Sequence, residues 1–190
     1  MRTLFLCLTL PGLLPCGLQA ADSDLATMRE KAVRFLRLTQ DTDGSCTEDR
    51  MVGVTGLVTT SLLRSGLPAK NPLVAAGLEN LLSHHQADGG FYAEGSLHRN
   101  YETCITVLAL SAANNGGQYD EHIKKAQGFL KGLQWDEGEG IESSDPAFGG
   151  GGYGSHQRPD LSNTQFMLEA LKKSGMKKDD PAMQRVLVFL

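Results

Sequence analysis

A short motif that recurs three times is the feature of this sequence that most restricts its fold. In each copy an apolar pair is followed by a glutamine and then by a glycine turn, and the glutamines recur after 46 and 48 residues. The three copies end in Gln40 and Gly44, Gln86 and Gly89, and Gln134 and Gly138. A period of this length is typical of helical repeat arrays, in which each unit buries its apolar face only by stacking on its neighbours.

A second pattern follows each copy of the motif. A threonine precedes a small residue and a leucine, and a Gly or Asn that suits the end of a helix follows four residues after the leucine. The threonines are Thr55, Thr103 and Thr164, and the helix-ending residues are Gly66, Asn114 and Gly175. The sequence therefore predicts an all-α fold of helical hairpins. In each hairpin, helix A ends at the glutamine, a glycine turn follows, and helix B ends at the Gly or Asn.

Start signals for helix A stand at the expected repeat boundaries. Asn71 and Asp180 each precede a proline, which places a capping residue before a proline at the first helical position. The first helix A is expected to begin near Ser23 or Thr27, because Thr27 and Glu30 have the spacing of a capping box.

The first motif resembles a known repeat. Residues 31–46 resemble the QW motif of squalene cyclases, with Cys46 where that family has tryptophan, and residues 158–165 look like the region around the acid motif of those cyclases. This resemblance to the prenyltransferase and squalene oxidase repeat family covers about residue 25 to the end. It implies an α/α toroid, here a partial ring of about three and a half hairpins within residues 21–190. The B helices would line a central cavity, with their first turns at its mouth.

The resemblance also suggests where a catalytic acid would stand. In that family the acid motif is Asp-x-Asp-Asp-Thr. The matching stretch here runs from Asp160 to Thr164, with Ser162 and Asn163 in place of the two central carboxylates. A strongly acidic carboxyl group depends on neighbouring carboxyl and hydrogen-bonding groups. Asp160 and Glu102 are therefore candidate acids without a complete motif. The alternative for Asp160 or Ser162 is a cap on the following helix.

The sister group, the protein prenyltransferases, holds zinc through an Asp-x-Cys pair and a histidine just before Thr-Cys. Here the stretch that ends in Thr103 and Cys104 has Glu102 in place of the histidine, and no Asp-x-Cys precedes it. A catalytic zinc site needs three protein ligands. We expect neither zinc nor another cofactor, and we interpret His84 and His85 as a solvated pair that points to different faces.

Several polar residues are expected near the cavity mouth, where they could contact a ligand. They are Tyr101, Glu102, His156, Arg158, Asp160 and Asn163. The glycine-rich stretch 138–154 lacks the lysine and hydroxyl residues of a phosphate-binding loop and is interpreted as a surface insertion. The repeated glutamines are expected to satisfy backbone groups at helix ends and to tie adjacent hairpins together.

Residues 1–20 have the pattern of a secretory signal peptide. Arg2 supplies a positive start, an apolar run follows, and the stretch up to Ala20 gives a plausible cleavage site. The chain is thus expected to be exported, either secreted or held in the periplasm or cell envelope. Its net charge of −4 gives no support for a nucleic-acid partner. In an oxidising compartment Cys46 and Cys104 could pair, although isolated thiols are the favoured interpretation.

The last five residues, Val186 to Leu190, are all apolar and suggest the end of another helix A. The domain at 21–190 is therefore expected to be incomplete at its C-terminus, and to self-associate through this edge because an uncovered apolar face is unfavourable in water.

Three functions remain open at this point. The favoured hypothesis is a non-catalytic repeat module that binds an apolar, isoprenoid-like small molecule or a protein partner on its concave face. The second is an enzyme similar to the terpene cyclases, with its acid beyond residue 190. The third is a structural assembly protein of the cell envelope.

Overall fold

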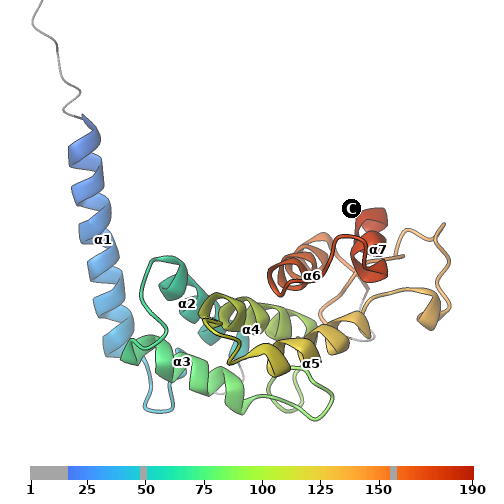
Figure 1. Cartoon of the computed structure of the whole chain (residues 1–190), viewed down its shortest axis with the longest axis horizontal. Helices are drawn as coiled ribbons and strands as arrows, with labels where there is room; N and C mark the ends of the chain where they lie inside the picture. Colours follow the sequence, from blue (N-terminus) through green and yellow to red (C-terminus); the bar gives the residue numbers. More distant parts are fainter. Residues whose placement is uncertain (1–16, 48–50, 155–157) are drawn as a thin grey trace, which may run out of the picture. The chain divides into compact units, whose positions relative to one another are not determined.

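The computed structural model describes residues 17–47, 51–154 and 158–190. Every secondary-structure element named within these ranges is a helix. The predicted all-α class is confirmed. The chain divides into two compact units, one that ends at Phe35 and one at Leu36–Leu190. Helix α1 (Gly17–Thr39) forms the described part of the first unit, and its last turn opens the second (Figure 1).

Helix α1 corrects the expected start of the first helix A. It begins at Gly17, so Thr27 lies within the helix, where its hydroxyl donates a hydrogen bond to the Ser23 carbonyl oxygen at 2.9 Å. A threonine inside a helix can bond back to the preceding turn in this way instead of capping. The predicted signal peptide falls largely outside the described residues and stays a prediction. Among the described helices, none has the length and apolar character needed to cross a membrane.

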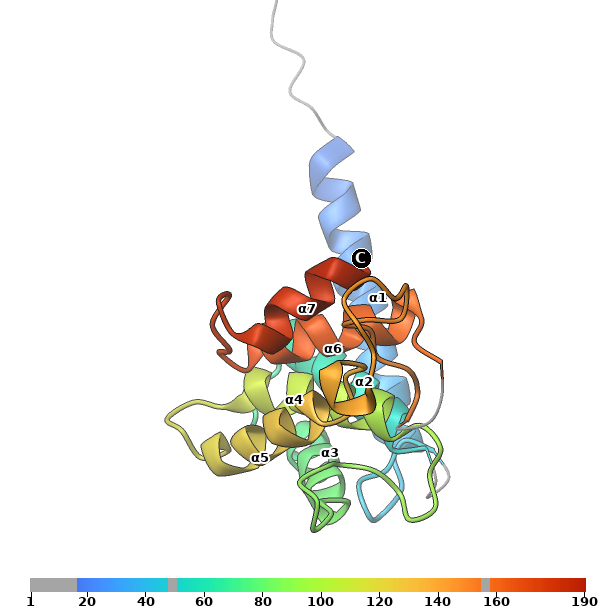
Figure 2. The same cartoon turned by 90° about the vertical axis from the view of Figure 1, so that its right-hand side faces the viewer.

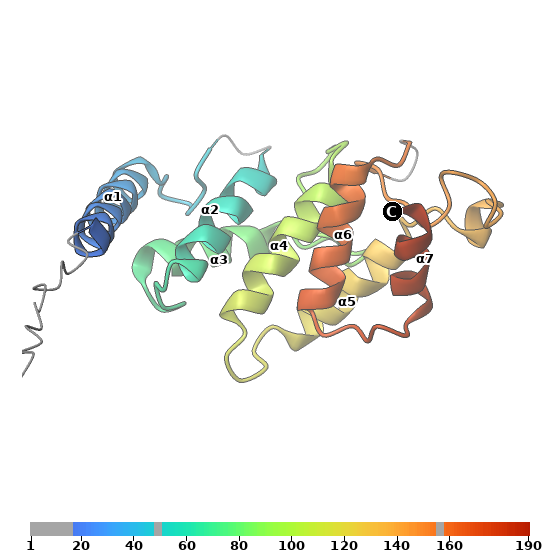
Figure 3. The same cartoon turned by 90° about the horizontal axis from the view of Figure 1, so that it is seen from above.

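The second unit consists of two rows of helices. Helices α2 (Val52–Arg64), α4 (Arg99–Ala113) and α6 (Leu161–Lys173) lie side by side, with α4 between the other two; we call them the central row (Figure 3). Helices α3 (Pro72–Ser83), α5 (Asp120–Lys131) and α7 (Pro181–Phe189) form the flanking row (Figure 1). Each flanking helix packs against the central helix that precedes it in the chain.

This packing shifts the expected hairpins by one helix. We expected each flanking helix to pair with the central helix that follows it, but its main contacts are with the central helix before it. The reason is the turn between them. At Gly66 and Gly175 the backbone takes φ values of 93° and 86°, and the next amide bonds back to Leu62 or Leu171, so the chain reverses tightly.

The reversal between α4 and α5 differs from the prediction. Asn114 does not adopt the left-handed conformation: its φ is −78°, and its Oδ1 accepts a hydrogen bond from the Tyr119 amide at 3.0 Å. Gly116 and Gly117 carry the positive φ values instead, because glycine adopts them without steric cost. The predicted caps of α3 and α7 are confirmed, since the Asn71 and Asp180 side chains accept from the second helical amide.

Glycines in α2 allow α4 to approach closely. A Cβ at Gly56 would lie 2.6 Å from the Ile105 side chain, and one at Gly53 would lie 2.7 Å from the ring of Tyr101. Contacts this short leave no room for a larger residue unless the neighbouring atoms of α4 shift. The close approach brings the first turns of α2 and α4 together and holds Tyr101 over α2.

The loops that lead into the central helices share one construction. In each, a threonine hydroxyl from the first turns of the helix accepts a hydrogen bond from a loop amide, at 3.0 to 3.1 Å. The pairs are Thr55 with Cys46, Thr103 with Phe91, and Thr164 with Gly151. The threonines that defined the repeat in the sequence are therefore anchors for the loops at one end of the central row.

The same loops show that one glycine of the predicted motif was assigned wrongly. Gly44 and Gly89 have positive φ, and a Cβ on either would collide with a carbonyl oxygen of the next flanking helix. The third glycine with this geometry is Gly149, whose Cβ would lie 1.9 Å from the Arg185 carbonyl oxygen. The predicted residue, Gly138, lies instead in the short 3-10 helix η1 (Glu137–Glu139), within a series of turns between Gln134 and Gly149 (Figure 2).

Two of the repeated glutamines link successive flanking segments as predicted. The Nε2 of Gln40 donates to the Leu73 carbonyl oxygen, and that of Gln134 donates to the Ala182 carbonyl oxygen, both at 3.0 Å. Each acceptor belongs to the second residue of a flanking helix. Gln86 is bonded differently: its Nε2 donates to the Tyr92 carbonyl oxygen within its own loop.

The backbone shows why Gln86 differs. In the three loops the amide that closes the turn belongs to Asp41, Gln86 and Trp135. The residue before that amide is Gln40 in the first loop and Gln134 in the third, but His85 in the second. His85 therefore occupies the position of the linking glutamine, and Gln86 stands one residue further along.

Candidate functional site

A pocket lies where the first turns of the three central helices meet. Its volume is about 490 Å³. It is lined by Met51, Gly53, Val54, His98, Tyr101, Glu102, Tyr153, Ser162 and Phe166. The loop anchors described above hold these turns in place, so the repeat itself builds the pocket.

The lining follows the repeat register. Gly53, Tyr101 and Ser162 each stand two residues before the anchoring threonine of their helix. Val54 and Glu102 stand one residue before it. Equivalent positions of three helices thus converge on one space, which is the arrangement expected of a binding site in a repeat array.

Aromatic rings form the walls of the pocket. The Tyr101 and Phe166 rings meet edge to face, with centroids 5.2 Å apart and an interplanar angle of 89°. Tyr153 meets His98 at 5.0 Å and 88°, and it lies 6.5 Å from Tyr101. Edge-to-face pairs of this kind are favourable beyond the area that they bury. The walls therefore present apolar ring surface that is held in a fixed arrangement.

One carboxyl group lies among these rings. Glu102 is only 3% exposed, and its Oε2 is buried without a hydrogen-bond partner among the described residues. Burial raises the pKa of Glu102, although hydrogen bonds from the Ser96 side chain and the Ala93 backbone act in the opposite direction. Because an unpaired buried carboxylate is costly, this group favours either a proton or a positively charged partner.

The other predicted site residues have different roles. Asp160 caps α6: its Oδ1 accepts from the Asn163 amide at 2.9 Å and its Oδ2 from the Asn163 side chain at 2.6 Å. Asn163 is buried beneath this cap, and neither residue lines the pocket. Arg158 is exposed and also lies outside the lining, whereas His156 falls outside the described residues. Of the six predicted residues, the structure brings Tyr101 and Glu102 together in the pocket.

Phe166, Tyr153 and His98 line the pocket and were missed from the sequence. Phe166 stands two residues after its anchoring threonine, but the equivalent residues Leu57 and Ile105 do not line the pocket, so the repeat register gave no signal for it. Tyr153 and His98 lie in segments that do not repeat, and only the folded chain brings Tyr153 beside His98 and Tyr101.

In the part of the chain that the structure describes, no group of three or more His, Cys, Asp or Glu residues is placed so that it could hold a metal ion. Cys46 and Cys104 are both free. The Cys104 thiol is buried, donates to the Asn100 Oδ1 at 3.2 Å, and has a pKa raised by burial. A thiol in this state is a poor nucleophile.

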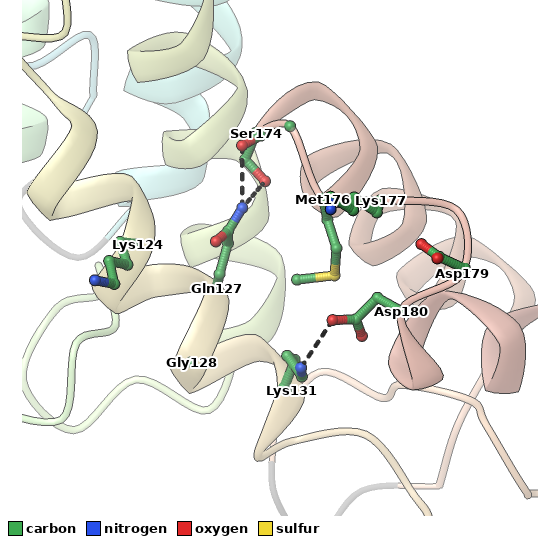
Figure 4. A pocket seen from close by; sticks show the side chains of 10 residues that line it. Lys124, Gln127, Gly128, Lys131, Ser174, Met176, Lys177, Asp179 and Asp180 are labelled. Atoms are coloured by element: carbon green, nitrogen blue, oxygen red, sulfur yellow. Dashed lines mark hydrogen bonds and ion pairs between the residues drawn. The ribbon is translucent and has the colours of Figure 1, made fainter.

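A second hollow, of about 580 Å³, lies between α5 and the turn from α6 to α7 (Figure 4). Two pairs of its polar groups are bonded across it. The Gln127 Nε2 donates to the Ser174 carbonyl and hydroxyl oxygens, and Lys131 forms an ion pair with Asp180 at 3.1 Å. Since these bonds join the helices around it, we interpret this hollow as part of the packing between repeats.

We compared the chain with protein-family models, with curated proteins and with solved structures, and none of the three comparisons gave a match.

Proposed function

We propose that this protein is an exported, non-catalytic ligand-binding module of the α/α-toroid kind, and that its ligand occupies the pocket over the first turns of the central helices. One observation carries the proposal: the residues two positions before the three anchoring threonines converge on an aromatic-walled pocket of about 490 Å³. Pockets for small ligands are typically concave and mostly apolar, with few polar groups that fix orientation. An apolar, isoprenoid-like molecule fits this description.

The chemistry of the pocket favours binding over cyclisation. Protonation of an alkene needs an acid that neighbouring groups make unusually strong. Burial instead raises the pKa of Glu102, which makes it a weaker acid. The carboxyl group of Asp160 is occupied as the cap of α6. A cyclase-like reaction would therefore depend on an acid from outside the described residues.

Titration with geraniol, a small terpenoid alcohol, tests this function. Addition of geraniol to the isotope-labelled full chain is expected to shift the amide signals of Gly53, Tyr101 and Ser162, as seen by two-dimensional NMR. Phe166→Ala should weaken binding by roughly tenfold or more, since it removes much of one aromatic wall.

Leu187→Ala is the matched control, because Leu187 is an exposed apolar residue of α7 that does not line the pocket. It should leave the affinity unchanged. If geraniol shifted no signal from the pocket, or if it bound Phe166→Ala as tightly as the unaltered chain, this function would be wrong.

A further inference from the structure

We propose that the ligand of this pocket carries a protonated amine, which is received between the aromatic walls and the carboxyl group of Glu102. This inference rests on the proposed function, because it names the chemistry of the ligand for the same pocket.

The charge of the lining is the first argument. Among its described residues the pocket has one acidic side chain, Glu102, and neither lysine nor arginine. Arg99 stands beside His98 on the chain but is engaged elsewhere. Its guanidinium lies over the Tyr92 ring at 5.0 Å, and its Nε donates to the Ser96 carbonyl oxygen. The described lining therefore offers a carboxyl group without a lysine or arginine to pair with it, and its one histidine, His98, packs edge to face against Tyr153.

The unsatisfied oxygen of Glu102 is the second argument. Glu102 is only 3% exposed, and its Oε2 is buried with no hydrogen-bond partner among the described residues. A buried carboxylate oxygen left in this state costs free energy, and an ammonium group that donates to it would remove that cost. A neutral hydrocarbon would leave the oxygen unsatisfied and would bury it more deeply.

The aromatic walls are the third argument. Tyr101 meets Tyr153 and Phe166 at interplanar angles of 62° and 89°, so neither ring is stacked face to face on Tyr101. A cation near the face of an aromatic ring is attracted by the ring quadrupole, and the attraction grows when water is excluded. Rings around a single carboxyl group are therefore better suited to an organic cation than to an uncharged molecule of the same shape.

A comparison of geranylamine with geraniol tests the inference, since the two share a carbon skeleton and differ in the ammonium and hydroxyl groups. At pH 7 we expect the full chain to bind geranylamine at least about tenfold more tightly in calorimetric titration. Glu102→Gln should remove this preference, so that the variant binds geranylamine and geraniol with similar affinities. Tyr153→Leu keeps an apolar side chain at an exposed position. It should weaken the binding of geranylamine more than the binding of geraniol.

The outcomes separate the two proposals. Equal affinity of the unaltered chain for amine and alcohol would overturn the inference and leave the binding function standing. Failure of both compounds to bind the pocket would overturn both. If Glu102→Gln did not fold, the unaltered chain and Tyr153→Leu would still test the inference. A preference for the amine that survived loss of the Tyr153 ring would contradict the role of the aromatic walls.

Discussion

Replacement of Gln134 tests the idea that the repeated glutamine ties one flanking segment to the next. Its side chain is 1% exposed, and its Nε2 donates to the carbonyl oxygens of Gly149 and Ala182, both at 3.0 Å. Gln134→Ala would remove two hydrogen bonds worth about 0.5 to 1.5 kcal/mol each and leave a small cavity. Loss of the unpartnered Oε1 offsets part of this cost. We expect a loss of about 2 to 4 kcal/mol in the free energy of unfolding.

Urea unfolding followed by circular dichroism measures this change, and Gln86→Ala is the matched control. Gln86 is partly buried, and its Nε2 donates within its own loop, to the Tyr92 carbonyl oxygen at 2.8 Å. Its replacement should cost about 1 kcal/mol or less. Equal losses in the two variants would refute the reasoning, because Gln134 would then have no linking role beyond an ordinary loop contact.

Two further predictions follow from the repeat register. His85→Gln should raise the free energy of unfolding by about 0.5 to 1.5 kcal/mol, since it restores the linking amide in the second loop. Burial, His122 and Lys125 lower the folded-state pKa of His85, and Asp88 opposes them more weakly, so protonation of His85 favours the unfolded chain. The unaltered chain should therefore lose stability below about pH 6.5, and His85→Gln should remove that loss. Melting curves at about pH 5.5 and 7.5 would show the difference. Gly149→Ala should cost more than about 3 kcal/mol in urea unfolding, because of its positive φ and its contact with Arg185, whereas Gly138→Ala should be nearly neutral; similar effects of both would contradict the reassigned turn.

The sequence was informative where one residue type has one physical use. Proline after Asn71 and after Asp180 marked two helix starts correctly, because proline fits only the first turn of a helix without loss of a hydrogen bond. The anchoring threonines were found because their spacing repeats. Glu102 and Tyr101 were expected near the site because they immediately precede one of these threonines.

The sequence misled where neighbouring residues could share a role. Gln86 stands next to His85, and only the backbone hydrogen bonds decide which of them occupies the linking position. Gly138 was chosen over Gly149 because extra turns separate Gln134 from the true turn glycine, and a spacing rule cannot anticipate an insertion. The contacts that Tyr153 makes with Tyr101 and His98 depend on tertiary packing, so no local pattern could predict them.

A crystal structure of the chain with geranylamine would test the central claim most directly. The account predicts electron density for the ligand between Tyr101, Tyr153 and Phe166, with its nitrogen within hydrogen-bond distance of the Glu102 carboxyl group. Density for the ligand in the hollow between α5 and the turn from α6 to α7, with the aromatic pocket empty, would contradict it.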